Sequence, residues 1–118
     1  MTRVLIVEDD PILGLDLSEQ LVDAGYTVVG PAMSAGEGVA LVAGEGCDVA
    51  ILDVNLGRET SEAVAVALAA RGVPFFVLSG YSSDQHPAVF KGAPLLVKPV
   101  RITQLLAELR VLTAPPRS

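Results

Sequence analysis

The 118-residue chain has no tryptophan, one cysteine and only 4% aromatic residues. A lone cysteine, Cys47, cannot form an internal disulfide, which suits a reducing cytoplasm, and we interpret it as a small apolar residue before a strand. Basic residues are also few, since 8 Lys and Arg stand against 14 Asp and Glu for a net charge of −6. This balance argues against nucleic-acid binding by the chain itself, because phosphate backbones recruit basic surfaces.

No apolar run approaches membrane-spanning length, and the run at residues 4–7 is too short for a signal peptide, so we expect no membrane association. Nevertheless, 51% of the residues are apolar. A chain of this length can bury a full core, and this composition excludes disorder and favours one compact domain of helices packed on a sheet. We assign residues 1–113 to that domain and the proline-rich residues 114–118 to a flexible tail.

Short apolar runs alternate with helical patterns along the chain. The runs are nearly continuous rather than alternating, as expected of parallel strands that are covered on both faces. A regular alternation of strands and helices predicts a doubly wound α/β fold with a five-stranded parallel sheet and right-handed crossovers. The predicted strands cover residues 3–7, 27–31, 49–52, 75–78 and 95–97.

Helix ends can be located from capping residues. Asp10 before Pro11 predicts an N-cap followed by proline at the first helical position, and Gly25 ends that helix. Ser34 and Glu37 have capping-box spacing at the start of a second helix that ends near residue 44. Two further helices are predicted from apolar positions: Val64, Ala67 and Leu68 in the third, which Gly72 closes, and Ile102, Leu105, Leu106 and Leu109 in the last.

The segment at residues 79–95 is the exception to this regular pattern. It reads SGYSSDQHPAVFKGAPL, with two prolines, two glycines and little periodicity. We therefore expect the fourth helix to be short or irregular. His86 within it is interpreted as a solvated loop residue.

Polar side chains follow four of the five predicted strands. The carboxyl ends of parallel strands meet at one edge of the sheet, where ligands of such folds bind. Any one of these residues has an ordinary structural explanation as a cap, a turn residue or a solvated lysine. Together they are hard to explain by stability, because buried charges are costly. They are Glu8 and Asp9 after the first strand, Asp53 after the third, Ser79 after the fourth and Lys98 after the fifth.

This set of residues suits phosphoryl chemistry. A cluster of carboxylates favours a hard divalent cation, which keeps waters and shares its shell with phosphate oxygens. Lys98 supplies a positive charge for an anion, and Ser79 supplies a hydrogen-bond donor. A metal site, a cation, a hydroxyl and an acceptor carboxylate are together the requirements for phosphoryl transfer onto an aspartate.

These residues resemble the receiver domain of two-component response regulators. The resemblance covers nearly the whole chain and rests on four motifs in order: LIVEDD at 5–10, ILDVNL at 51–56, VLSG at 77–80 and LLVKP at 95–99. It implies a flavodoxin-like fold with strand order 2-1-3-4-5. It also implies a bacterial signalling phosphoprotein that is not an enzyme, beyond assisting its own phosphorylation and dephosphorylation.

The resemblance assigns a role to each site residue. Asp53 would accept a phosphoryl group from a histidine kinase or phosphotransfer protein and pass the signal to an unknown downstream protein by contact. Mg²⁺ or Mn²⁺ would bind to Asp9 and Asp53 directly and to Glu8 more through water. The remaining roles implied are a metal-binding backbone carbonyl at Asn55, a phosphoryl donor at Ser79, and a phosphoryl-pairing ammonium at Lys98, next to a cis peptide bond with Pro99.

Two departures from the common receiver pattern are similar to the FAT GUY subgroup. Leu95 stands where many receivers have an aromatic switch residue, so signalling by an aromatic rotamer is in doubt, and the fourth helix is degenerate. The segments FVLSGY at 76–81, DVNLG at 53–57 and ALAARGVPF at 67–75 also resemble this subgroup. Tyr81 and Asn55 would flank the path of the attacking water, although Tyr81 is equally well explained as a surface aromatic residue.

Two other functions remain open on the sequence. One is a Mg²⁺-dependent phosphatase with an aspartate nucleophile, but Asp53-Val54-Asn55 has no second carboxylate to act as its general acid. The other is a scaffold that retains the fold without using phosphate. The full set of five charged or hydroxyl side chains argues against this second alternative.

Overall fold

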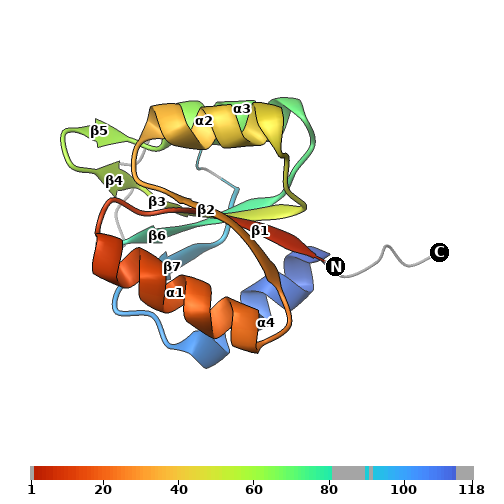
Figure 1. Ribbon diagram of the computed structural model, residues 1–118. Coiled ribbons are helices and arrows are strands. Elements are labelled where there is room, and N and C mark those ends of the chain that lie inside the picture. Colours follow the sequence, from red (N-terminus) through yellow and green to blue (C-terminus); the bar gives the residue numbers. More distant parts are fainter. Residues whose placement is uncertain (1, 81–89, 91, 114–118) are drawn as a thin grey trace.

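A computed structural model describes residues 2–80, 90 and 92–113. Its centre is a five-stranded sheet in the order β2-β1-β3-β6-β7, with all neighbouring strands parallel (Figure 1). This confirms the predicted order 2-1-3-4-5, since β6 and β7 are the fourth and fifth strands of this sheet. The strands are β1 (Arg3–Val7), β2 (Thr27–Ala32), β3 (Val49–Asp53), β6 (Phe75–Ser79) and β7 (Leu95–Val97).

Helices cover both faces of the sheet. In Figure 1, α1 (Pro11–Asp23) and α4 (Ile102–Thr113) lie on one face, and α2 (Ala35–Gly44) and α3 (Glu62–Ala70) lie on the other. Successive side chains of a strand point to opposite faces, so β1 contributes to both cores. Val4 and Ile6 pack with Leu21, Leu105 and Leu109 of α1 and α4, and Leu5 and Val7 pack with Val42, Val64 and Leu68 of α2 and α3.

The helix ends form where the capping residues predicted them. Asp10 Oδ1 accepts hydrogen bonds from the N–H groups of Ile12 and Leu13 at 2.9 and 3.3 Å. At the start of α2, Ser34 Oγ accepts from the Glu37 N–H at 3.1 Å. Asp10 therefore belongs to the fold, and it fixes where α1 starts relative to the end of β1.

A small hairpin, which the sequence did not reveal, follows Asp53. It pairs β4 (Asn55–Leu56) with β5 (Glu59–Thr60) in antiparallel register, and Gly57 in its turn has a φ of 68°. Two-residue strands are too short to show a periodic pattern, which explains why the sequence predicted none. Leu56 anchors the hairpin in the core, and the Glu59 carboxylate accepts from the Ala35 N–H at 3.5 Å.

Several expectations fall outside the described residues. Tyr81 and His86 are among them, as are the tail at 114–118 and most of the segment predicted to hold a short or irregular fourth helix. Within residues 2–80, 90 and 92–113, no helix has both the length and the apolar character needed to cross a membrane.

Helices α2 and α3 pack closely at Gly38. A Cβ atom built on Gly38 would lie 2.8 Å from Val64 Cγ2 and 3.3 Å from Val7 Cγ2. Valine is stiff at χ1 because it is branched at Cβ, so Val64 has little freedom to move away. The absence of a side chain at position 38 therefore sets the distance between the two helices.

We predict that Gly38→Ala lowers the free energy of unfolding by about 1–3 kcal/mol, as expected for overpacking a buried contact. Urea unfolding followed by circular dichroism measures this change. Gly36→Ala is the matched control in the same helix, because its Cβ would meet nothing closer than Ser34 Oγ at 4.0 Å. Equal stability of the two variants would show that Gly38 does not set the helix packing.

Candidate functional site

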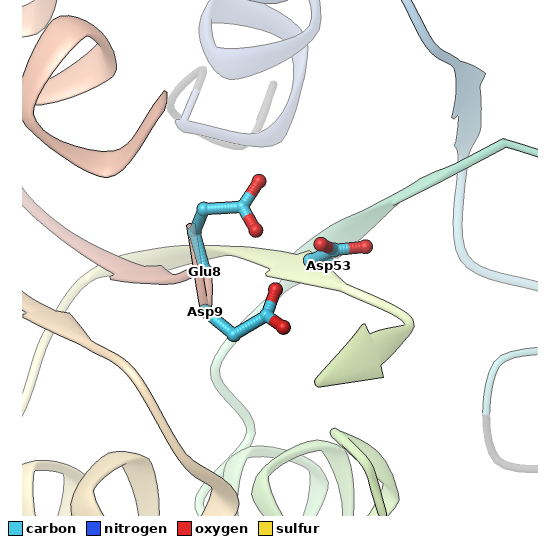
Figure 2. Close-up of side chains that lie close together, drawn as sticks. All are labelled: Glu8, Asp9 and Asp53. Carbon is cyan, nitrogen blue, oxygen red and sulfur yellow. The ribbon is translucent and has the colours of Figure 1, made fainter. Parts of the chain in front are cut away.

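Three carboxylates lie together at the carboxyl edge of the sheet. Glu8 and Asp9 follow β1, and Asp53 ends the neighbouring strand β3, so strand pairing brings them together (Figure 2). Each offers a carboxylate oxygen, and these three atoms all lie within 4.8 Å of one another. Glu8 and Asp53 are buried, with 3% and 6% exposure, while Asp9 is more exposed. Hard oxygen ligands at this spacing fit a divalent cation such as Mg²⁺.

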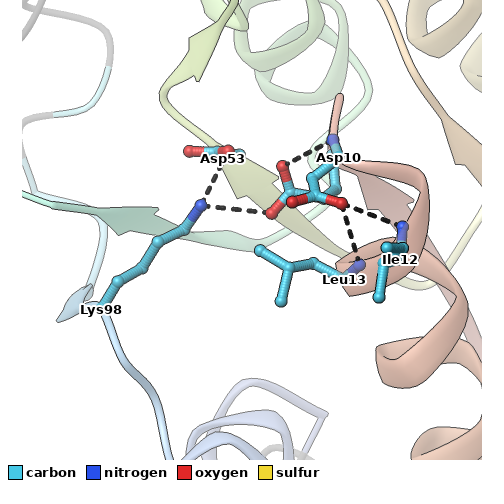
Figure 3. A network of polar contacts seen from close by, with 6 residues as sticks. Asp10, Ile12, Leu13, Asp53 and Lys98 are labelled. Atoms are coloured by element: carbon cyan, nitrogen blue, oxygen red, sulfur yellow. Dashed lines mark hydrogen bonds and ion pairs between the residues drawn. The ribbon is translucent and has the colours of Figure 1, made fainter.

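Lys98 completes the cluster from the other side. Its Nζ lies 2.9 Å from Asp53 Oδ2 and 3.2 Å from Glu8 Oε1, and 29% of its side chain is exposed (Figure 3). An unpaired buried carboxylate is strongly destabilising, and the ammonium offsets part of that cost for both acids. The Lys98–Pro99 peptide bond is cis, as the resemblance implied.

Burial and neighbouring carboxylates raise the pKa of Glu8 and of Asp9. Burial raises the pKa of Glu8, and the nearby Asp53 raises it further, against the opposing effects of the Asp10 N–H and Lys98. Burial and then Glu8 raise the pKa of Asp9. Burial alone would lower the pKa of Lys98, but its contacts with Asp53 and Glu8 raise it above the ordinary value. Lys98 therefore stays an ammonium, but this single positive charge lies beside three carboxyl groups.

Ser79 and Asn55 lie at the same edge of the sheet. Ser79 ends β6 and is fully buried, and its carbonyl accepts the Lys98 N–H at 2.8 Å. Asn55 is exposed and begins the hairpin, two residues after Asp53. Leu95 begins β7 and packs partly buried against the α2–α3 core. β6 and the hairpin therefore place Ser79 and Asn55 at the edge of the central sheet where the four charged residues lie.

The sequence did not reveal two features of the site. One is the contact between Glu8 and Lys98, which depends on where β7 lies in the sheet. The other is a cavity of about 360 Å³ between α1 and α4. Its polar lining residues are Glu8, Asp16, Gln20 and Lys98, and its apolar lining includes Leu13, Leu17, Leu78, Val100, Ile102 and Leu105. For the contact between Glu8 and Lys98, the available signal in the sequence was a glutamate at position 8, whose side chain is longer than that of an aspartate.

Comparison with known proteins gives a consistent result. Residues 4–110 match the family model of the response regulator receiver domain. The chain is similar to the transcriptional regulatory protein PdtaR of Mycobacterium tuberculosis, with 35% identity over 108 residues, covering 88% of this chain and 53% of that protein. It is also similar to the regulatory protein VirG of Rhizobium rhizogenes, with 31% identity over 116 residues, covering 94% and 48%. The chain thus spans about half the length of these curated relatives.

Solved structures agree with the fold. A CheY-like receiver domain protein from Methanospirillum hungatei superposes with a TM-score of 0.84 at 30% identity, covering 94% of this chain and 92% of that one. The non-phosphorylated HemR receiver domain from Leptospira biflexa gives a TM-score of 0.83 at 25% identity, covering 100% and 98%.

The raised pKa of Asp9 predicts a pH-dependent stability effect. Its folded-state pKa lies above the ordinary value of 3.8, so the metal-free fold loses stability as the pH rises from that value through the folded-state pKa. We expect Asp9→Asn to be more stable than the wild type at neutral pH without divalent cations. This difference should vanish near about pH 3.5, where the carboxylate is mostly protonated.

Urea unfolding at the two pH values, with chelator present, measures this difference. Asp23→Asn on the exposed end of α1 serves as the control and should change little. If Asp9→Asn were destabilising at neutral pH, the assignment of repulsion at this position would be wrong.

Proposed function

This chain belongs to the family of response regulator receiver domains, and from this premise we propose that Asp53 is the phosphoacceptor of a two-component phosphorelay. The observation that supports the proposal most directly is the contact between Lys98 Nζ and Asp53 Oδ2 at 2.9 Å, in which Asp53 is one of three clustered carboxylates. An acceptor needs a carboxylate oxygen at the site edge, a fixed cation beside it and room for a phosphoryl group. Asp53 meets the first two requirements directly.

The chemistry transfers a phosphoryl group from a phosphohistidine to Asp53. A carboxylate oxygen of Asp53 attacks the phosphorus, an O–P bond forms, and the N–P bond to the donor imidazole breaks, so the imidazole leaves and is protonated. Lys98 pairs with a phosphoryl oxygen, and the Ser79 hydroxyl donates to another. Both interactions stabilise the negative charge on the phosphoryl oxygens in the transition state. Such stabilisation is most of what this reaction requires from the protein.

The acidic cluster supplies the metal site of this proposal. Asp9, Asp53 and the Asn55 backbone carbonyl would hold Mg²⁺ or Mn²⁺, with Glu8 contributing through water. The spacing of the three carboxylates supports this ligand set. When bound, the cation would neutralise phosphoryl oxygens as the acyl phosphate forms.

We further propose that residues 1–113 form a cytoplasmic signalling module. Its phosphodonor is a histidine kinase or phosphotransfer protein, and its output is contact with a downstream protein. It catalyses no reaction on a separate substrate and assists only its own phosphorylation and dephosphorylation. The segments at 53–57, 67–75 and 76–81, together with Leu95, support placing it in the FAT GUY subgroup.

Incubation with Mg²⁺ and acetyl phosphate tests the acceptor assignment. The intact mass of the wild type should increase by one phosphoryl group, and Asp53→Asn should show no increase, because its amide is not a nucleophile under these conditions. Asp23→Asn, which changes an exposed carboxylate far along α1, should be labelled like the wild type.

Absence of labelling on the wild type, under conditions that label another receiver domain, would contradict the proposal. Steady turnover of a small phosphate ester that disappears in Asp53→Asn would instead support the phosphatase alternative.

A further inference from the structure

The outer sides of α2 and α3 carry almost no charge. The two helices lie side by side on one face of the sheet and touch where Gly38 meets Val64 (Figure 1). Glu37 and Glu62 are the charged residues that these two helices expose, and each lies in the first turn of its helix. The other exposed residues are Gly36, Ala40, Ala43 and Gly44 on α2, and Ala63, Val66, Ala69 and Ala70 on α3. A helix that faces water ordinarily carries polar residues on its outer side, so this composition indicates a contact surface.

Exposed apolar side chains form one stripe on α3. Ala63, Val66 and Ala70 are three and four residues apart, which places them on the same side of the helix. Val66 lies in the middle of the stripe, and 54% of it is exposed. The alanines on either side of it let a second helix approach to the lower end of the usual distance between helix axes, about 8 Å. The stripe is therefore suited to packing against another helix centred on Val66.

The charges at the two ends of α3 have opposite signs. Glu62 begins the helix and Arg71 follows its last residue, and both are exposed. Val66 is four residues from Glu62 and five from Arg71. If two copies of α3 packed in antiparallel orientation about Val66, Glu62 of each copy would lie level with Arg71 of the other. Parallel packing would place like charges level with each other, so α3 complements a second copy of itself in the antiparallel orientation.

The distribution of charge also distinguishes this face from the face of α1. The chain has a net charge of −6, so two copies repel each other least where their surfaces carry no charge. α1 exposes larger apolar side chains, with Ile12 at 77% and Leu15 at 60%, but Asp16, Glu19 and Asp23 are exposed on the same helix. Two copies that met through α1 would bring these acids together, whereas the outer sides of α2 and α3 would not.

We propose that two copies of this chain associate through the outer sides of α2 and α3, with the two α3 helices antiparallel across a two-fold axis near Val66. A two-fold axis uses the same surface on both copies, so the pair of Glu62 and Arg71 occurs twice in the dimer. Because the contact is a helix face and is small, the association is weak and depends on concentration. The acidic cluster and Lys98 take no part in it, so the inference goes beyond the proposed function and does not depend on it.

Analytical ultracentrifugation over a concentration series up to about 1 mM, the range of weak association, measures the dimer. The average mass of the wild type should rise from that of one chain toward that of two. Val66→Asp places a charge beside the two-fold axis in both copies, and it should weaken association by about hundredfold or more. Val111→Asp makes the same change at an exposed valine of α4, on the other face of the sheet, and should associate like the wild type.

Reversal of the end charges tests the antiparallel orientation. Glu62→Lys and Arg71→Glu each change two pairs per dimer from attraction to repulsion, so each variant should associate about tenfold more weakly than the wild type. Net charge alone predicts the opposite for Glu62→Lys, because that variant is less negative. Mixed in equal amounts, the two variants regain opposite charges at both contacts and should form heterodimers with about the affinity of the wild type. This recovery requires both variants to be folded, so it excludes misfolding as the cause of the losses.

Three results would each overturn the proposal. The first is a wild type that sediments as a single chain at every concentration. The second is an equal loss of association in Val66→Asp and Val111→Asp, which would place the contact elsewhere or make it nonspecific. The third is a mixture of the two charge variants that associates no better than either variant alone. These measurements need neither Mg²⁺ nor a phosphodonor, so they decide the proposal even if Asp53 accepts no phosphoryl group.

Discussion

The Lys98 ammonium lies between two buried carboxylates, and the arrangement of the site depends on this contact. Glu8 and Asp53 come from adjacent strands, whereas Lys98 comes from β7, two strands away from β3. Strands lie about 4.8 Å apart, so β7 is about 10 Å from β3. A lysine stem is long enough to cover most of that distance across the end of β6, which a shorter cation could not do.

The fold holds in place the strand ends that carry the carboxylates of this contact. Asp10 caps α1 directly after the acidic pair, and its own N–H donates to the Glu8 carboxylate. The start of α1 and the site are therefore connected through the Glu8 carboxylate. On the other side of the sheet, the hairpin after Asp53 is anchored by Leu56 in the core and by Glu59 at the start of α2. Both loops that carry acids are therefore tied to helices as well as to strands.

Much of this structure could be predicted from the sequence, because apolar runs and capping residues act locally. β1 and β7 have the predicted bounds, and β2, β3 and β6 each extend one residue further, which places Asp53 and Ser79 in their strands. The hairpin was missed because its strands have two residues each. The Glu8–Lys98 contact joins residues 90 positions apart and depends on side-chain reach, which no periodic pattern encodes.

The three carboxylates and Lys98 form one unit that is short of positive charge until a divalent cation binds. Thermal unfolding of the wild type over a series of Mg²⁺ concentrations tests this most directly, because a ligand that binds only the folded state raises the unfolding temperature with its concentration. We expect the midpoint to rise with Mg²⁺ and to stay nearly constant in Asp9→Asn. A midpoint that is independent of Mg²⁺ in the wild type, or that rises equally in both proteins, would contradict the central claim.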